Sequence, residues 1–151
     1  MKGGPTKMSV IAKRRSTIQA GLDWQPTEEQ EQAAVIEWRD LMLPQFPELE
    51  DLIHIPNGGW RSKSEAVRLK KIGVKPGVSD LFLPAPVGKY HGLWIEMKRQ
   101  QGGRLRPDQK DWLDRMNRKG YLALRADGAE EACEMIYRYL KGEENVGNKK
   151  R

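Results

Sequence analysis

The order of hydrophobic and polar positions along the chain predicts alternating helices and strands. Apolar residues recur three or four positions apart in the segments 27–43, 62–73, 106–120 and 129–140, which predicts four amphipathic helices. Short apolar runs, "DLIHIP", "LFLP", "GLWIEM" and "YLALR", predict strands at 51–56, 81–84, 92–97 and 121–125. This order of elements indicates an α/β fold, in which helices flank a small mixed β-sheet.

The ends of the predicted elements divide the chain into three parts. Residues 1–23 are rich in Gly, Pro, Ser, Thr and basic residues and lack periodicity, which predicts a disordered basic arm. This arm either contacts nucleic acid or is simply solvated. Residues 24–141 contain all the predicted elements and are expected to form one domain. Residues 142–151 are expected to form a charged, flexible tail.

Composition narrows the classes of protein that fit. The chain has 151 residues, a formal net charge of +6 and a sequence pI of about 9.5, which favours a polyanionic partner such as nucleic acid. The single cysteine excludes an intrachain disulfide and fits a reducing compartment. No early apolar run is long enough for a signal peptide or a membrane span, so we expect a cytoplasmic protein without a membrane partner.

Three charged residues stand within or beside two of the predicted strands. Asp80 comes before the first strand, and Glu96 and Lys98 lie in the second. Since side chains alternate along a strand, Glu96 and Lys98 share one face with Trp94. If the two strands form an antiparallel hairpin, Asp80 lies beside the end of the second strand. All three charges then meet at one edge of the sheet.

Two carboxylates at such an edge form an oxygen-ligand site for Mg²⁺ or Mn²⁺. A lysine beside the metal could steer or deprotonate an attacking water and neutralise charge on a phosphate. The alternative is that these charges only line a solvated strand face, which is common in antiparallel sheets. The strongly apolar flanks of both strands and the Pro-Gly pair before Asp80 favour a built site.

Further motifs appear around the three charges, namely "IPNGG", "GVKPGVSDLFL", "WIEMKR" and "RPDQKDWL", followed by "GY" before a short strand. In this order they resemble the VRR-NUC family of the PD-(D/E)XK nuclease superfamily, and most of all its stand-alone phage and bacterial members. The resemblance covers about residues 28–140. It implies a restriction-endonuclease-like core and a magnesium-dependent nuclease acting on DNA. Relatives are known for structure-specific or Holliday-junction cleavage.

The resemblance also implies roles for particular residues. Asp80 and Glu96 would bind the metal, with the backbone carbonyl of Met97 as a further ligand. Lys98 would be the catalytic lysine, and Gln109, in the following helix, would lie near the metal or the scissile phosphate.

The family carries a glutamate on its first helix, where this chain offers Glu28, Glu29 and Glu31. We favour Glu28, acting through a water, because Gln32 shares its helix face. The family often has Ser or Thr before the proline of "RPDQK", whereas this chain has Arg106. Arg106 is therefore expected to contact phosphate.

Basic and polar residues around these motifs are candidates for contacts with the DNA backbone, although a solvated helix face would have the same composition. The candidates are Asn57, Gly58, Arg61, Lys63, Arg68, Lys70, Lys71, Arg99, Arg104, Arg106 and Lys110.

The sequence favours the first of three functions, because the intact set of Asp80, Glu96 and Lys98 argues against the second. The first is a Mg²⁺- or Mn²⁺-dependent endonuclease acting on branched or nicked DNA, as a homodimer, in the cytoplasm of the host if a phage encodes it. The second is a DNA-binding module of the same fold without catalysis. The third is a basic RNA-structuring protein, which would leave the apolar-flanked carboxylates unexplained.

Overall fold

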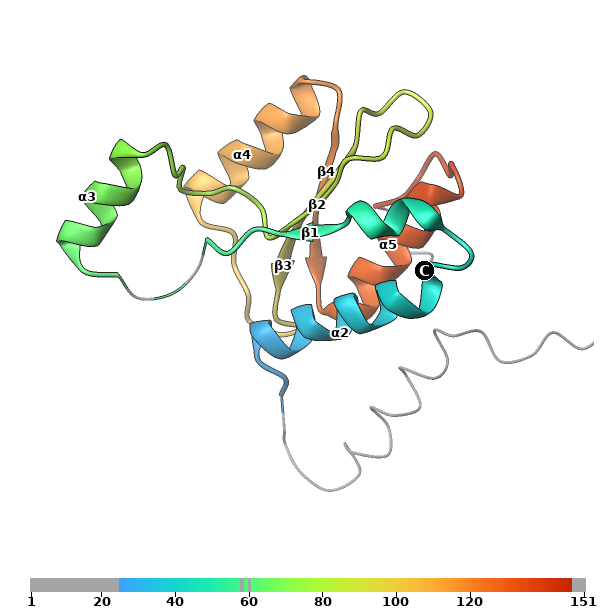
Figure 1. Cartoon of the computed structure of the whole chain (residues 1–151), viewed down its shortest axis with the longest axis horizontal. Helices are drawn as coiled ribbons and strands as arrows, with labels where there is room; N and C mark the ends of the chain where they lie inside the picture. Colours follow the sequence, from blue (N-terminus) through green and yellow to red (C-terminus); the bar gives the residue numbers. More distant parts are fainter. Residues whose placement is uncertain (1–24, 58, 60, 148–151) are drawn as a thin grey trace, which may run out of the picture.

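A four-stranded mixed sheet forms the centre of the molecule in the computed structural model, which describes residues 25–57, 59 and 61–147 (Figure 1). The strands lie in the order of the chain: β1 (Ile53–His54), β2 (Leu81–Leu83), β3 (Leu93–Lys98) and β4 (Leu122–Asp127). β1 pairs antiparallel with β2 and β2 antiparallel with β3, whereas β3 pairs parallel with β4. The predicted α/β class, mixed sheet and β2–β3 hairpin are therefore confirmed.

Four α-helices and one 3-10 helix are described around this sheet: α2 (Glu28–Met42), η1 (Pro47–Asp51), α3 (Lys63–Lys71), α4 (Pro107–Arg118) and α5 (Ala129–Leu140). A capping box begins α2. The Thr27 hydroxyl accepts from the Gln30 backbone N–H, and the Gln30 side chain accepts from the Thr27 N–H. The strand expected at 51–56 is shorter than predicted: β1 covers only residues 53–54, and η1 includes Asp51.

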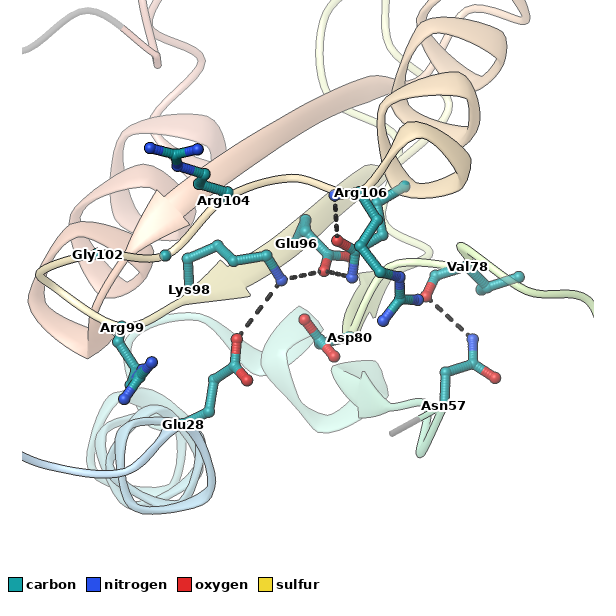
Figure 2. Close-up of a pocket in the computed structure, with 12 residues that line it drawn as sticks. Glu28, Asn57, Val78, Asp80, Glu96, Lys98, Arg99, Gly102, Arg104 and Arg106 are labelled. Carbon is teal, nitrogen blue, oxygen red and sulfur yellow. Dashed lines mark hydrogen bonds and ion pairs between the residues drawn. The ribbon is translucent and has the colours of Figure 1, made fainter. Parts of the chain in front are cut away.

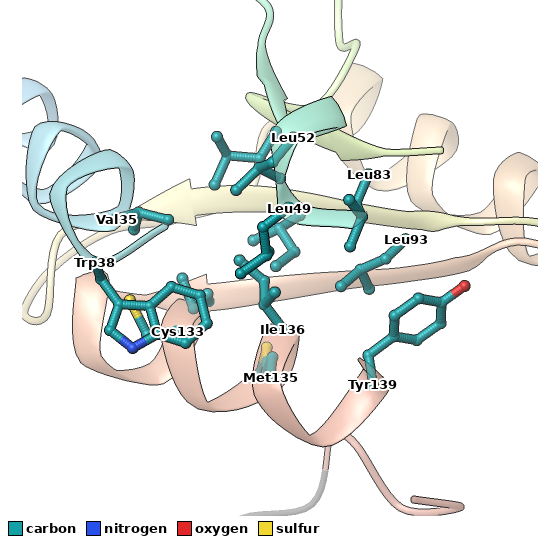
Figure 3. Packing of buried hydrophobic residues seen from close by; sticks show 14 of the residues in the cluster. Val35, Trp38, Leu49, Leu52, Leu83, Leu93, Cys133, Met135, Ile136 and Tyr139 are labelled. Carbon is teal, nitrogen blue, oxygen red and sulfur yellow. The ribbon is translucent and has the colours of Figure 1, made fainter. Parts of the chain in front are cut away.

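Alternation along β3 divides the interior into two apolar clusters. Leu93, Ile95 and Met97 face the larger one, which α2 and α5 cover with Val35, Trp38 and Ile136 among others (Figure 3). Trp94 faces the other side, where it packs against the cluster of Leu113, Met116 and Ala123 under α4. The sheet thus lies between α4 on one face and α2 with α5 on the other (Figure 1). Glu96 and Lys98 lie on the same face as Trp94, at the C-terminal end of β3.

Helix α3 is amphipathic as predicted, but its apolar positions do not pack into the core. None of its residues is buried, and Ile72, directly after it, is 67% exposed. Figure 1 shows α3 standing away from the sheet. The helix begins where predicted, since the Ser62 hydroxyl accepts from the Glu65 N–H. Ala66 and Ile72 are exposed and Leu69 is only half-buried, so this apolar stripe does not belong to either apolar cluster.

The segment after α5 folds back onto the domain. Val146 is 4% exposed and belongs to the large apolar cluster, and Arg138 bonds both the Glu143 side chain and the Val146 carbonyl. Residues up to 147 therefore pack with the domain, although the sequence suggested a tail from 142. Among the described residues, no helix combines the length and apolar character needed to cross a membrane.

Candidate active site

The β2–β3 hairpin brings the three predicted charges together. Asp80 precedes β2, and one oxygen of its carboxylate accepts a 2.8 Å hydrogen bond from the backbone N–H of Met97 on β3. This bond fixes Asp80 beside the end of β3, where Glu96 and Lys98 project from the same face. The predicted convergence at one edge of the sheet is present.

Glu96 and Lys98 are not a solvated face, because they are 1% and 7% exposed. The Lys98 ammonium lies 2.6 Å from Glu96 Oε1, 2.9 Å from the Met97 carbonyl oxygen and 3.4 Å from Glu28 Oε1. A lysine cation thus already sits among the oxygen atoms expected to bind metal. Figure 2 shows this line of contacts from Glu28 through Lys98 to Glu96.

Gln109, in the first turn of α4, joins this helix to the acidic cluster. Its amide nitrogen donates to Glu96 Oε1, and its amide oxygen accepts from the Arg106 backbone N–H at 3.0 Å. Gln109 therefore supplies the capping contact that Arg106 cannot make with its own side chain. The Arg106 guanidinium instead pairs with Asp108.

The three glutamates of the first turn of α2 have different positions. Glu28 reaches Lys98, whereas Glu29 is exposed and is not part of the pocket lining. Glu31 is fully buried and accepts a 2.7 Å hydrogen bond from the Ala129 N–H at the start of α5. Of the three, Glu28 is the one that contacts Lys98 and lines the pocket, whereas Glu31 ties α2 to α5.

Glu28, Glu96 and Lys98 line one side of an open pocket of about 280 Å³ (Figure 2). The Asn57 side chain, opposite, donates a 3.0 Å hydrogen bond to the Val78 carbonyl. The full lining comprises Glu28, Asn57, Val78, Asp80, Glu96, Lys98, Arg99, Gly102, Gly103, Arg104, Arg106 and Gln109.

The predicted DNA-contacting residues fall into two groups. Asn57, Arg99, Arg104 and Arg106 lie at the pocket. The others are outside its lining: the half-buried Arg61, the exposed basic residues of α3, and Lys110, which pairs with Asp114 on the surface of α4. Gly58 lies outside the described residues.

Burial changes the acidity of both carboxyl groups. Desolvation raises the pKa of Glu96 from 4.5 to about 7, although the Lys98 hydrogen bond opposes this rise. Desolvation also raises the pKa of Asp80, against the lowering effects of the Met97 N–H and the Lys98 charge. Burial therefore disfavours the charged form of both carboxyl groups, and a nearby cation opposes this effect.

The donor set suits a hard divalent cation. Within the described residues no group of three or more His, Cys, Asp and Glu side chains has metal-binding geometry, but Mg²⁺ often takes only one or two carboxylates. Asp80, Glu96 and the Met97 carbonyl offer oxygen atoms alone. Glu96 Oε2 is buried, and the described residues provide it with no hydrogen-bond partner. Such an acceptor fits an incoming cation.

Two supporting residues escaped the sequence analysis. The His54 Nδ1 on β1 lies 3.0 Å from the Asp80 carbonyl oxygen and supports the backbone of a central residue. Gly77 has a φ of +81°, and a Cβ there would lie 2.4 Å from the Asp108 carbonyl oxygen. Only glycine therefore lets the loop before Asp80 approach α4. The Pro76-Gly77 pair signalled a turn, but no local pattern signalled its contact with α4.

Comparison with known proteins assigns the chain to a class. The family model for the VRR-NUC domain matches residues 7–130. The chain belongs to this family, a nuclease-type domain family. The match begins within the segment 1–23 that the sequence analysis set apart as an arm.

A solved structure described as a VRR_NUC domain protein is similar to this chain in both sequence and fold. The two are 30% identical, with a TM-score of 0.69 over 80% of this chain and 93% of the other. No curated protein matches the chain.

Proposed function

We propose that this protein is a metal-dependent DNA endonuclease of the PD-(D/E)XK type, which hydrolyses phosphodiester bonds. The observation that carries the proposal is the buried cluster of Glu96 and Lys98, with Asp80 beside it, at the edge of an open pocket. Burying these charges is costly, and a structural role could be filled by apolar residues. Membership of a nuclease-type family supports the same conclusion.

Asp80, Glu96 and the Met97 carbonyl would hold Mg²⁺ or Mn²⁺, and Glu28 would contribute through a water. The metal, when bound, lowers the pKa of water and neutralises charge on the phosphate. Glu28 is more exposed than Glu96 and stands across the lysine from it, which suits a second, outer position.

Lys98 would orient or deprotonate the attacking water, or neutralise the charge that develops on the phosphate oxygens. Its ammonium is held at a defined place by Glu96 and the Met97 carbonyl. Gln109 fixes one oxygen of Glu96 from the opposite helix and so positions the reacting groups.

The arginines at the pocket, Arg99, Arg104 and Arg106, would bind the phosphates next to the cleaved bond, with Asn57 on the opposite side. We keep Gly58, the next residue in the sequence, as a further candidate for a DNA contact. Arg61, Lys63, Arg68, Lys70, Lys71 and Lys110 would bind phosphates further along the DNA. Phosphate contacts carry no base information, so we propose recognition of shape, as in nicked or branched DNA including Holliday junctions. A homodimer would suit a two-stranded target. We expect the activity in the cytoplasm, that of the host if a phage encodes the protein.

The proposal is tested by incubating the full chain with supercoiled plasmid and with a four-way junction, in Mg²⁺, in Mn²⁺ or in EDTA. We expect cleavage in at least one metal and none in EDTA. Glu96→Gln and Lys98→Ala should each reduce the rate by at least about a hundredfold while DNA affinity stays within a few-fold of wild type. Glu134→Gln, on the exposed face of α5, is the matched control.

If the wild type binds DNA but cuts neither substrate in either metal, the chain is a DNA-binding module instead. If labelled RNA displaces DNA from it, RNA is the preferred partner.

A further inference from the structure

Two residues of β4 lie beside the active site without a role in the proposal above. In the parallel pairing of β3 with β4, Arg125 is opposite Glu96 and Asp127 is opposite Lys98. Paired residues of neighbouring strands project from the same face of a sheet. Arg125 and Asp127 therefore stand on the face that carries the catalytic charges.

The Arg125 guanidinium connects the sheet to the loop that follows β3. Its Nε donates to Asp127 Oδ1 at 2.7 Å, and its Nη2 donates to the backbone carbonyl of Gly103 at 2.8 Å. The planar fork of an arginine can make both bonds at once. Asp127 thus orients Arg125, and Arg125 holds the middle of the loop of residues 99–106, which we call the arginine loop.

At Gly103 the backbone of this loop packs directly against the side chain of Lys98. A Cβ at Gly103 would lie 2.8 Å from the Lys98 Cβ and 3.3 Å from its Cδ, so the loop backbone touches the aliphatic part of the lysine side chain. Lys98 has a long, flexible stem, and its low exposure depends on such a cover. The same loop carries Arg104 and Arg106 to the pocket.

We propose that Arg125 is a positioning residue, which fastens the arginine loop over Lys98 and so holds the catalytic ammonium beside Glu96. The side-chain hydrogen bonds of Arg125 go to Asp127 and to the Gly103 carbonyl, and not to Lys98 or Glu96. Arg125 therefore acts through the loop backbone. The structural part of this inference stands on geometry alone. Its catalytic consequence rests on the proposed nuclease function.

The first test uses Arg125→Met in the metal-free full chain, with Arg118→Met as the control because Arg118 is exposed at the far end of α4. Hydrogen exchange of the backbone amides at 100–105 and acetylation of Lys98 by an N-hydroxysuccinimide ester are measured by mass spectrometry. We expect both rates to rise several-fold in Arg125→Met and to match the wild type in Arg118→Met. Unchanged rates in Arg125→Met would overturn the inference.

Two further variants separate positioning from charge and from misfolding. Arg125→Lys keeps the charge but lacks the fork, so it should resemble Arg125→Met; wild-type rates in it would reduce the role to charge alone and overturn the inference. Asp127→Asn removes the group that orients Arg125 and should loosen the loop to a smaller extent. If Arg125→Met does not fold by circular dichroism, Asp127→Asn carries the same test, and unchanged exchange in it would overturn the inference.

A further experiment compares the rates at which the wild type and Arg125→Met cleave the four-way junction or plasmid. Loss of a supporting contact around a metal site typically costs about tenfold to a hundredfold in activity, and we expect kcat to fall by this amount in Arg125→Met, with a smaller change in KM. A wild type that cuts nothing would end the proposed function but leave the exchange and acetylation results valid. An active wild type with an unaltered kcat in Arg125→Met would end only the positioning role.

Discussion

Two parts of this molecule show opposite relations between polarity and burial. At the end of β3 a glutamate and a lysine are almost completely buried, whereas on and after α3 the apolar side chains of Val67 and Ile72 are 57% and 67% exposed. Both segments have an amphipathic pattern in the sequence. The difference lies in what surrounds each segment in the folded protein.

Hydrogen-bond and ion-pair partners explain why the charges of Glu96 and Lys98 can be buried. Glu96 receives hydrogen bonds from Lys98 and from Gln109, and Lys98 also reaches the Met97 carbonyl, so pairing offsets part of the cost of desolvation. Helix α3 has no such neighbours, since none of its residues is buried. A polar side chain favours exposure and an apolar side chain favours burial. The elements packed around the side chain decide whether it is in fact exposed or buried.

The largest effect on stability should come from breaking the buried pair. In Lys98→Met, Glu96 stays buried without its cation, and we expect the free energy of unfolding at pH 8 to fall by about 3–5 kcal/mol. The double variant Glu96→Gln/Lys98→Met should recover much of this loss. Denaturant unfolding measures both, with the exposed Lys119→Met as control.

The loss should depend on pH with a definite sign. Because the pKa of Glu96 is raised from 4.5 to about 7 in the folded protein, its stabilising contribution is complete below pH 4.5 and is lost as the pH rises through 7. Removing Lys98 raises this pKa further, so Lys98→Met should be less destabilised at pH 5 than at pH 8. Equal losses at both pH values would show that Glu96 is not the titrating group.

Metal binding should depend on pH, because it requires the buried carboxyl groups to be ionised. A metal ligand must be deprotonated, so the affinity for Mn²⁺ should rise by about tenfold between pH 6 and pH 8, with proton uptake by the buffer at the lower pH. Isothermal titration calorimetry in two buffers measures affinity and proton release together. Asp80→Asn should weaken binding at both pH values, and unchanged binding in it would remove Asp80 from the ligand set.

The basic face of α3 should contribute to DNA affinity without contributing to chemistry. Lys70→Ala/Lys71→Ala should weaken DNA binding several-fold and reduce the slope of log affinity against log salt by about 2, since each phosphate contact contributes about one unit. The cleavage rate at saturating DNA should stay at the wild-type value. The double variant Arg118→Ala/Lys119→Ala removes the same charge from the end of α4 and should have little effect on DNA affinity. If it weakens binding as much as the α3 variant, the contribution of α3 comes only from the net charge of the protein and not from direct phosphate contacts.

The smallest effect should be that of Ile72→Ala, at less than about 0.5 kcal/mol in the free energy of unfolding. Ile136→Ala, the same change on the buried face of α5, should cost about 2–5 kcal/mol. A larger loss for Ile72→Ala that grows with protein concentration would show that a second copy of the chain covers α3.

Much of the candidate active site follows from local sequence patterns. The alternation of β3 predicts that Glu96 and Lys98 share a face, and the Pro-Gly entry to β2 with the hairpin places Asp80 beside them. The structure has this register, with Leu81 paired with Ile95. Periods of two and of 3.6 residues are properties of the backbone, so they can be recognised without knowing the fold.

Other parts depend on contacts between distant segments. The pattern of "TEEQEQ" favours Glu28, but it does not show that Glu28 faces Lys98 or that Glu31 binds the start of α5 about a hundred residues later. No spacing links Arg125 to Gly103, or Gly77 to α4.

The amino-acid sequence by itself determined the helices and strands, their caps, the hairpin and the pair of charges on one strand face, because these depend on neighbours along the chain. Only the tertiary structure decided that these charges are buried, that Glu28 joins them and that α3 remains uncovered. Burial and ion pairing depend on which elements meet in space, and the packing of α2, α4 and β4 around the end of β3 is a property of the whole fold.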